Sequence, residues 1–438
     1  MGIKVAKFGG SSLADANQFR RVHDILLSDP DRRFVVPSAP GKRFKEDIKV
    51  TDLLYRVYAL VEKDQCADEA FQAVADRYEE IVRELGLDFD IKSVLADTYT
   101  EIKRVISPDF TASRGEYLNG RVLAAYMGWD FIDAKDVMKF DRQGVFAPEW
   151  TDQIMREELK KHTHAVIPGF YGSFPNGDVR TFSRGGSDIS GAVVARAADA
   201  DLYENWTDVS GFLMADPRIV ENPLSIAHRS YRELRELSYM GATVLHEDAI
   251  FPVHKAGIPT NIRNTNDPAH PGTMITVEQV NHEDGPVITG IAGHKNFTLI
   301  SIEKGMMNAE LGFGRRVLEA VEDFGVSFEH LPTGIDTMCV VISDAELVQK
   351  RDQIIERIRE TCHPDSVEVM GGLALIATVG YGMVKKHGTA AKLFGALYQA
   401  DVNVRMIDQG SSEMNIIVGV DVEDFEKAVR AIYNAFVE

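Results

Sequence analysis

Cysteine is scarce in this chain. Only three cysteines occur among 438 residues, and Cys66, Cys339 and Cys362 lie far apart without metal-like spacing. This usage is typical of a reduced intracellular protein, so we expect no disulfide and no structural zinc. Long hydrophobic runs are also missing, since no stretch approaches the length of a membrane span and residues 1–7 contain no apolar signal-peptide core. The sequence therefore predicts a cytoplasmic protein.

Positive charge is low relative to negative charge. The chain has 48 basic and 67 acidic residues, which gives a net charge of −19 (48 − 67 = −19). This excess argues against a general role on nucleic acids or membrane surfaces. Any anionic ligand must therefore be held by local cations that overcome a repulsive overall field.

Several common catalytic and binding motifs are absent. The chain has no Walker A phosphate loop and no dinucleotide-binding fingerprint, and its histidines show no spacing suited to a metal ion. No arrangement of Ser, His and Asp typical of acyl transfer is recognisable. We therefore predict neither covalent acyl chemistry nor a metal site built by the protein alone.

What the chain does contain is an alternation of strand-like and helical runs, such as residues 3–8 and 14–27. It extends from residue 1 to about 280 and predicts an α/β domain with a largely parallel sheet and helices on both faces. Charged helical stretches at about 62–107 interrupt it, and we interpret them as a structural helical insertion. At this length two or three domains are expected.

From near residue 285 the sequence repeats itself at an offset of 76 residues (375 − 299 = 76). Each copy has the order strand, loop, helix, strand, strand, helix, which predicts two small α+β units in tandem. We therefore predict domains at 1–284, 285–365 and 366–438. The matched pairs include Leu299 with Leu375, Ile300 with Ile376, Val317 with Leu393, and Gly334 with Gly410.

The first strand ends in a glycine-rich loop that begins with a cation. Lys7 is followed by Gly9, Gly10 and Ser11, and a helix is expected from about Ala14. Glycines leave backbone amides free to approach phosphate oxygens. A Gly-Gly turn with an incidental lysine is the alternative interpretation.

A second loop, Arg184–Asp188, combines a cation, two glycines, a hydroxyl and a carboxylate. It lies between a strand-like segment at 178–182 and a helical segment at 189–195, so it predicts a strand-to-helix junction. The unpaired amides at the start of that helix would face a ligand. This loop is suited to holding a small anion.

Two further segments are candidates for binding. Residues 207–218 have polar ends and an apolar middle, so Thr207 and Asp208 could serve a nucleotide sugar or a metal, and Arg218 a phosphate. A capped surface hairpin is the alternative. Residues 113–116 contain Arg114 and Glu116, which could pair with each other at a helix start or meet the charged ends of an amino acid.

Together with residues 38–41, which lead to Thr51, these motifs closely resemble aspartate kinase, and the repeat resembles the paired ACT domains of that family. The resemblance spans nearly the whole chain. It implies a three-layer αβα sandwich of the amino acid kinase (carbamate kinase-like) type, followed by two ferredoxin-like ACT domains. It also implies ATP and Mg²⁺ as cofactors and phosphorylation of L-aspartate to 4-phospho-L-aspartate, the entry to lysine, threonine and methionine biosynthesis. The chain length predicts a monofunctional kinase without a fused homoserine dehydrogenase.

The resemblance also implies site residues. Lys7 would be the catalytic lysine, and Asp188 would orient it. Aspartate binding is implied for Ser38, Thr51, Glu116, Arg184 and Ser187. ATP binding is implied for Lys7, Gly9, Gly10, Ser11, Thr207, Asp208, Leu213, Asp216, Arg218 and Thr243.

Two of these positions depart from the family pattern. Thr243 stands where a lysine is common, and Leu213 stands where a tyrosine is usual. We therefore expect weaker nucleotide contacts at both.

The first ACT copy resembles an effector-binding region. The alternative is that Phe328 belongs to the sheet core and Met307 fills a loop. Lysine is the first expected effector and threonine the second, and ACT edges predict a homodimer or a dimer of dimers. The implied effector residues are Met307, Gly312, Phe313, Phe328 and Glu329.

Two other functions remain open at this stage. One is a kinase for another amino acid, against which Thr51, Glu116, Arg184 and Ser187 argue. The other is an inactive amino-acid sensor with a kinase fold. Retention of Lys7 together with the aspartate at 188 argues against it.

Overall fold

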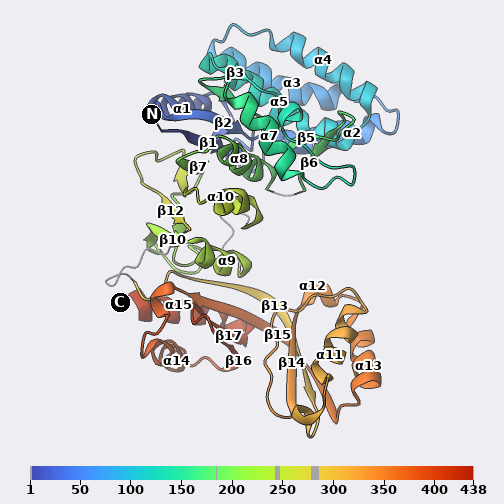
Figure 1. The fold of residues 1–438 in the computed structure, drawn as a ribbon, viewed down its shortest axis with the longest axis vertical. Coiled ribbons are helices and arrows are strands. Elements are labelled where there is room, and N and C mark those ends of the chain that lie inside the picture. Colours follow the sequence, from blue (N-terminus) through green and yellow to red (C-terminus); the bar gives the residue numbers. More distant parts are fainter. Residues whose placement is uncertain (1, 184, 242–246, 278–285, 438) are drawn as a thin grey trace. The chain divides into compact units, whose positions relative to one another are not determined.

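The computed structural model describes residues 2–183, 185–241, 247–277 and 286–437 of the chain (Figure 1). It divides into two compact units. The first comprises Met1–Phe212, Ser225–Tyr231 and Val244–Val280. The second comprises Leu213–Leu224, Arg232–Thr243 and Asn281–Glu438.

The first unit is built on an eight-stranded sheet. Its neighbouring strands are parallel except for one antiparallel pair, β11 with β12. The largely parallel sheet that the sequence predicts is therefore confirmed. In spatial order the strands are β10 (His228–Ser230), β12 (Thr273–Thr276), β11 (Thr260–Asn264), β7 (Leu202–Thr207), β1 (Lys4–Phe8), β2 (Arg32–Pro37), β4 (Ala165–Val166) and β3 (Asp130–Phe131).

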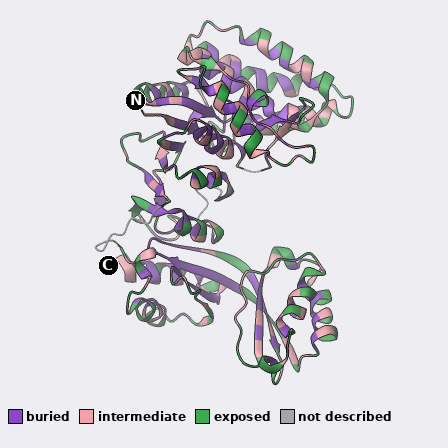
Figure 2. Cartoon of the chain, in the orientation of Figure 1, coloured by how far each residue is buried: buried purple, intermediate pink, exposed green. Residues whose placement is uncertain are grey.

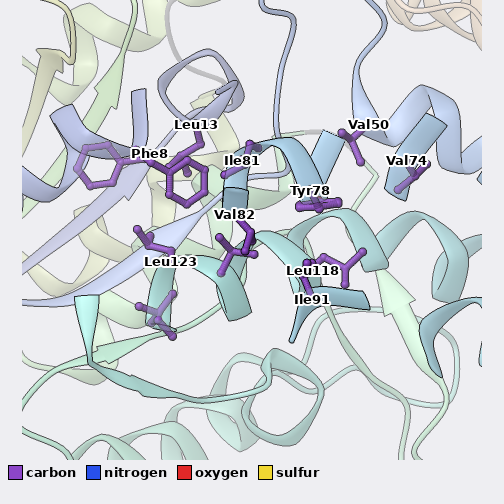
Figure 3. Packing of buried hydrophobic residues seen from close by; sticks show 14 of the residues in the cluster. Phe8, Leu13, Val50, Val74, Tyr78, Ile81, Val82, Ile91, Leu118 and Leu123 are labelled. Carbon is purple, nitrogen blue, oxygen red and sulfur yellow. The ribbon is translucent and has the colours of Figure 1, made fainter. Parts of the chain in front are cut away.

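Side chains along a strand alternate between the two faces of a sheet, and helices cover both faces of this one. On β1, Ala6 and Phe8 join the large apolar core that also contains side chains from five helices (Figure 3). Lys7 points to the other face, which α8 (Gly186–Ala197) covers. The three-layer fold is thus confirmed. The five helices of the large core are α1 (Ala16–Leu27), α2 (Val50–Val61), α3 (Asp68–Leu85), α4 (Ile91–Val105) and α5 (Pro108–Met127).

The predicted helical insertion consists of α3 and α4. The apolar residues Phe71, Val74, Tyr78 and Ile81 recur at helical spacing and bury one face of α3, while its other face is exposed (Figure 2). Gly86 ends α3 in the left-handed conformation, with φ of 63°. The insertion therefore packs into the core of the first unit.

The second unit contains one five-stranded antiparallel sheet of order β14-β13-β15-β17-β16. The sequence repeat is present in the structure, since β13 (Gly290–Glu303) and β15 (Ser366–Val379) start 76 residues apart (366 − 290 = 76). The helices α11 (Phe313–Glu322) and α14 (Thr389–Gln399) share this offset (389 − 313 = 76). The remaining main elements are β14 (Thr337–Ser343), α13 (Arg351–Cys362), β16 (Val404–Asp408), β17 (Asn415–Asp421) and α15 (Phe425–Val437).

The first copy departs from the predicted order in its second strand. Within the described residues 323–336, only isolated bridges occur, from His330 to Val341 and from Thr333 to Met338. Pro332 lies between them and has no amide hydrogen to donate to a ladder. The second copy has a full strand, β16, at the equivalent place.

Residues far from the repeat in sequence also belong to the second unit. Leu237 of α9 (Tyr231–Tyr239) and the nearby Met240 pack with Leu299 and Leu375 on one face of the five-stranded sheet. The Asn415 side chain donates a hydrogen bond of 2.6 Å to Glu236. The domain limits predicted at 284/285 and 365/366 remain predictions.

No helix in the described ranges is both long and apolar enough to cross a membrane.

Candidate active site

The candidate site lies where the direction of strand succession reverses in the first sheet. After β1 the chain continues to β2 on one side, and after β7 it continues to β11 on the other, although β1 and β7 are parallel neighbours. In open α/β sheets, ligands bind at the carboxyl ends of strands at such a point. The loops that follow Phe8 and Thr207 both leave from this edge, and the Gly9 amide donates to the Trp206 carbonyl at 3.0 Å.

An ion pair marks this edge. The Lys7 ammonium lies 2.6 Å from an Asp188 carboxylate oxygen, and the side chains are only 8% and 20% exposed. Asn205 lies opposite Lys7 in the strand register, and its amide donates to Asp188 at 2.8 Å. The aspartate therefore has two partners that fix its position in the first turn of α8. This places a buried, oriented cation beside the glycine loop.

The glycine loop packs backbone against backbone on a second loop. The Gly41 amide donates to the Gly10 carbonyl at 2.8 Å, and a β-carbon on Gly10 would lie 2.8 Å from the Ala39 carbonyl oxygen. Ser11 follows in the short helix η1 (Gly10–Leu13), and the neighbouring Ser12 shares a hydrogen bond with Thr265. Both loops are thus held close to the end of β1.

For the ATP site that the family resemblance implies, replacing Gly10 with alanine should lower kcat/KM for ATP by about ten- to a hundredfold, because the new methyl group would push apart two tightly packed backbone segments. Steady-state kinetics with varied ATP measures the effect. Gly395→Ala is the matched control, since a β-carbon there meets no atom within 4 Å. Equal kinetics for Gly10→Ala and the wild type would contradict the close packing.

The described residues predicted to bind aspartate lie on α5, after β2, and in the first turns of α2 and α8. Glu116 on α5 is buried, and one of its oxygens accepts a hydrogen bond of 3.2 Å from the Ala39 amide. Its second oxygen is buried with no hydrogen-bond partner in the described part of the chain. Burial raises the pKa of Glu116 from its ordinary value of 4.5 to about 8. A buried carboxyl with an unused oxygen is suited to receive a cationic group.

The other predicted aspartate-binding residues come from three further segments of the chain. Ser38 directly follows β2, and its carbonyl accepts a hydrogen bond of 2.6 Å from Asn119. Thr51 lies in the first turn of α2 and is half-buried, as is Ser187 in the first turn of α8. Arg184 lies outside the described residues.

Residues 113–116 lie in the second turn of α5. The Arg114 guanidinium contacts the rings of Phe110 and Tyr117, each at 4.4 Å, and donates to Ser113. Arg114 therefore has aromatic and hydroxyl partners, and Glu116 accepts from the backbone instead.

The predicted ATP-binding residues after β7 are divided between the two units. In the first unit, the hydroxyl of Thr207 donates to the exposed Asp208 at 3.2 Å. In the second, Leu213 is exposed and Arg218 pairs with Asp216 at 2.6 Å, a hydrogen bond that lowers the pKa of Asp216. Thr243 lies outside the described residues.

The implied effector residues occupy different environments in the first ACT copy. Met307 and Phe313 are buried in the apolar core beneath α11, whereas Phe328 is 42% exposed. Gly312 precedes α11 with a left-handed φ of 78°. Glu329 accepts a hydrogen bond from the Tyr239 hydroxyl.

The second copy contains a hollow at the equivalent place. It has a volume of about 640 Å³, and its lining includes Met383, Gly388 and Thr389. These are the positions of Met307, Gly312 and Phe313 shifted by 76 residues (383 − 307 = 76), with a threonine in place of the phenylalanine ring. Lys385 and Glu413 add charges of both signs to the lining.

The sequence predictions omitted two polar residues of this region, Asn205 and Asn119. Each is a buried amide, Asn205 on β7 and Asn119 on α5. For Asn205 the available signal was a polar residue within a buried strand, but Glu204 gives the same signal and forms a buried ion pair with Arg32 at 2.7 Å. Pattern alone could not separate the two cases.

The fold and the oriented lysine define an amino acid kinase domain. A model of the amino acid kinase family matches residues 2–264, more than half of the chain, and an ACT domain model matches residues 376–436. Aspartokinase 3 of Bacillus subtilis is 41% identical over 452 residues, covering 99% of this chain and 98% of that protein. The chain belongs to the aspartate kinase family.

Solved structures agree with this assignment. The aspartate kinase of Clostridium acetobutylicum superimposes with a TM-score of 0.93 at 56% identity, over 99% of this chain and 100% of that one. Escherichia coli aspartokinase III, solved with aspartate and ADP in its R-state, gives a TM-score of 0.77 at 26% identity over the full length of both chains. The same enzyme with lysine and aspartate in its T-state gives 0.73, also at 26% identity and over both full chains.

Proposed function

We propose that this protein transfers the terminal phosphoryl group of ATP to the side-chain carboxylate of L-aspartate and forms 4-phospho-L-aspartate. The single observation that supports this most strongly is the buried Lys7 ammonium, held by Asp188 beside the glycine loop at the sheet's switch point. Family membership supports the same reaction.

The chemistry needs no general base, because a carboxylate with a pKa near 4 is already an anion at neutral pH. The main barrier is the approach of one anion to another. Positioning and cations that stabilise charge on the transferring phosphoryl group must therefore supply the catalysis. Lys7 supplies that charge, and Asp188 keeps the ammonium in place without removing a proton from the substrate.

Aspartate recognition requires partners for one ammonium and two carboxylates. Glu116 meets the ammonium, and its unused buried oxygen is the acceptor for it. Ser38, Thr51 and Ser187 donate hydrogen bonds, and Arg184 binds a carboxylate through its planar fork.

Mg²⁺ fits this site through the nucleotide. Kinases hold this ion mainly by substrate phosphates with one or two carboxylates. Across the described ranges, no group of three or more His, Cys, Asp or Glu residues could hold a metal ion. Asp208 offers an exposed carboxylate after β7, and bound Mg²⁺ would neutralise charge on the β- and γ-phosphates.

Regulation by an amino acid is the second part of the proposal, with lysine as the first candidate and threonine as the second. The ACT domain match supports it. Two places suit an effector: the region of Phe328 and Glu329 in the first copy, and the charged hollow around Lys385 in the second. Association of ACT edges gives a homodimer or a dimer of dimers in the cytosol.

A coupled assay of ADP release tests the proposal. With aspartate we expect turnover that requires ATP and Mg²⁺, and with glutamate we expect none above background. Addition of lysine or threonine should lower the rate. A protein that binds lysine but releases no ADP with aspartate would instead be an amino-acid sensor.

A further inference from the structure

Helix α3 of the insertion places a buried arginine against the candidate site. Arg77 has a side chain that is 3% exposed and donates to the Gly41 carbonyl at 3.0 Å and to the Ala14 carbonyl at 3.4 Å. It also pairs with Asp47 at 2.7 Å. It donates to the Ile48 carbonyl at 3.4 Å as well, so one guanidinium binds three backbone carbonyls and one carboxylate.

Two of these carbonyls, those of Gly41 and Ala14, lie beside the glycine loop. Gly41 packs directly on Gly10, since a β-carbon on Gly41 would lie 2.6 Å from the Gly10 carbonyl carbon. Ala14 immediately follows the short helix η1, which begins at Gly10. Arg77 therefore links Ala14, at the end of η1, to Gly41, which packs on Gly10. These two links hold the backbone amides of Gly9, Gly10 and Ser11 in position.

The loop between β2 and α2 depends on the same arginine. Asp47 in this loop accepts from Arg77 and also from the backbone amide and guanidinium of Arg43. This loop leads to Thr51 at the start of α2. Removing the Arg77 guanidinium would leave buried carbonyls without a donor, which costs more than a hydrogen bond between exposed groups.

The next residue on α3 binds the other side of the site. The Tyr78 hydroxyl, fully buried in the core shown in Figure 3, donates to the Gly115 carbonyl at 2.6 Å. Gly115 precedes Glu116, and a β-carbon on Gly115 would lie 2.8 Å from the Ala39 side chain. Tyr78 therefore fixes the turn of α5 that presents the buried carboxyl.

We propose that α3 acts as a positioning element for the phosphoryl-transfer site, in which Arg77 positions the glycine loop for ATP and Tyr78 positions Glu116 for aspartate. This rests on the proposed kinase function. For packing alone, the apolar face formed by Phe71, Val74 and Ile81 would be enough, and α3 would not need buried polar side chains. Both polar side chains are instead used on backbone carbonyls beside candidate binding residues.

Kinetics of two adjacent variants test this proposal. Arg77→Gln should raise KM for ATP by about tenfold and KM for aspartate by a smaller factor of about two- to threefold, through the loop that leads to Thr51. Arg77→Lys, which keeps the charge but not the fork, should give an intermediate value. Tyr78→Phe should raise KM for aspartate by about three- to tenfold and leave KM for ATP unchanged. Arg83→Gln, an exposed change on the same helix, should match the wild type.

The pattern of the effects decides between positioning and packing. The proposal is overturned if both variants lower kcat or the unfolding midpoint to the same extent and neither changes one KM more than the other. Positioning requires that Arg77→Gln mainly affects KM for ATP and Tyr78→Phe mainly affects KM for aspartate. If Arg77→Gln does not fold, wild-type kinetics for Arg77→Lys would overturn it. Calorimetric titration with ATP distinguishes this failure from failure of the kinase proposal, because a weaker binding constant in Arg77→Lys needs no turnover of aspartate.

Discussion

Lys7→Ala should reduce kcat by a factor on the order of 10³ or more while the protein remains folded. The ammonium is the buried cation at the switch point, and fixed charges that stabilise a transferring phosphoryl group contribute effects of this size. KM for ATP should change much less than kcat, because the loss is concentrated in the transition state. Single-turnover ADP formation at saturating ATP and aspartate measures the chemical step directly.

Lys4→Ala is the matched control for this experiment. Lys4 lies on the same strand, but its ammonium pairs with Asp29 at 2.6 Å, away from Asp188. The kcat of Lys4→Ala should stay close to that of the wild type. A Lys7→Ala enzyme with nearly normal turnover would remove this lysine from the mechanism.

Glu116→Gln should raise KM for aspartate by about a hundredfold, because a neutral amide cannot pair with the substrate ammonium.

In the wild-type enzyme, KM for aspartate should also depend on pH through Glu116. Its carboxyl has a pKa of about 8, and the ionised form binds the ammonium, so KM for aspartate should rise about tenfold for each pH unit below 8. This slope should vanish in Glu116→Gln. Initial rates from pH 6 to 9 provide the measurement.

The raised pKa of Glu116 also predicts how the free energy of unfolding depends on pH in the absence of substrate. Its pKa is about 8 in the folded state and 4.5 ordinarily, so the folded state holds a proton between these values that the unfolded state releases. Its contribution to stability is therefore fully present below pH 4.5 and is lost as pH rises through 8. The free energy of unfolding, relative to Glu116→Gln, should fall by up to about 1.4 kcal/mol per pH unit in this window.

Denaturant titrations at several pH values check this second effect. Glu69→Gln, an exposed change on α3, is the control and should keep the wild-type pH dependence. If wild-type and Glu116→Gln stabilities run parallel from pH 4.5 to 8, the carboxyl is ionised in the folded protein. The predicted pH dependence of KM would then be wrong as well.

Much of the fold could be predicted because its signals are local. The two helices of the insertion, Asp68–Leu85 and Ile91–Val105, lie within the charged segment of about 62–107 that the sequence predicted to be helical. The repeat of 76 residues was likewise visible, since each copy must bury its own apolar faces. The prediction of a second strand in the first copy was wrong. Pro332 has no amide hydrogen to donate to a neighbouring strand, and the alternation of hydrophobic residues does not show this.

The sequence by itself determined the class of fold, the two glycine loops and the family, because spacing, glycine content and apolar period are properties of short segments. Only the tertiary structure decided which side chains meet. Asn205 donates to Asp188 from the strand beside Lys7, and Arg77 and Tyr78 reach carbonyls that lie tens of residues away in the chain. The raised pKa of Glu116 was also beyond the sequence, since desolvation depends on everything that surrounds a group.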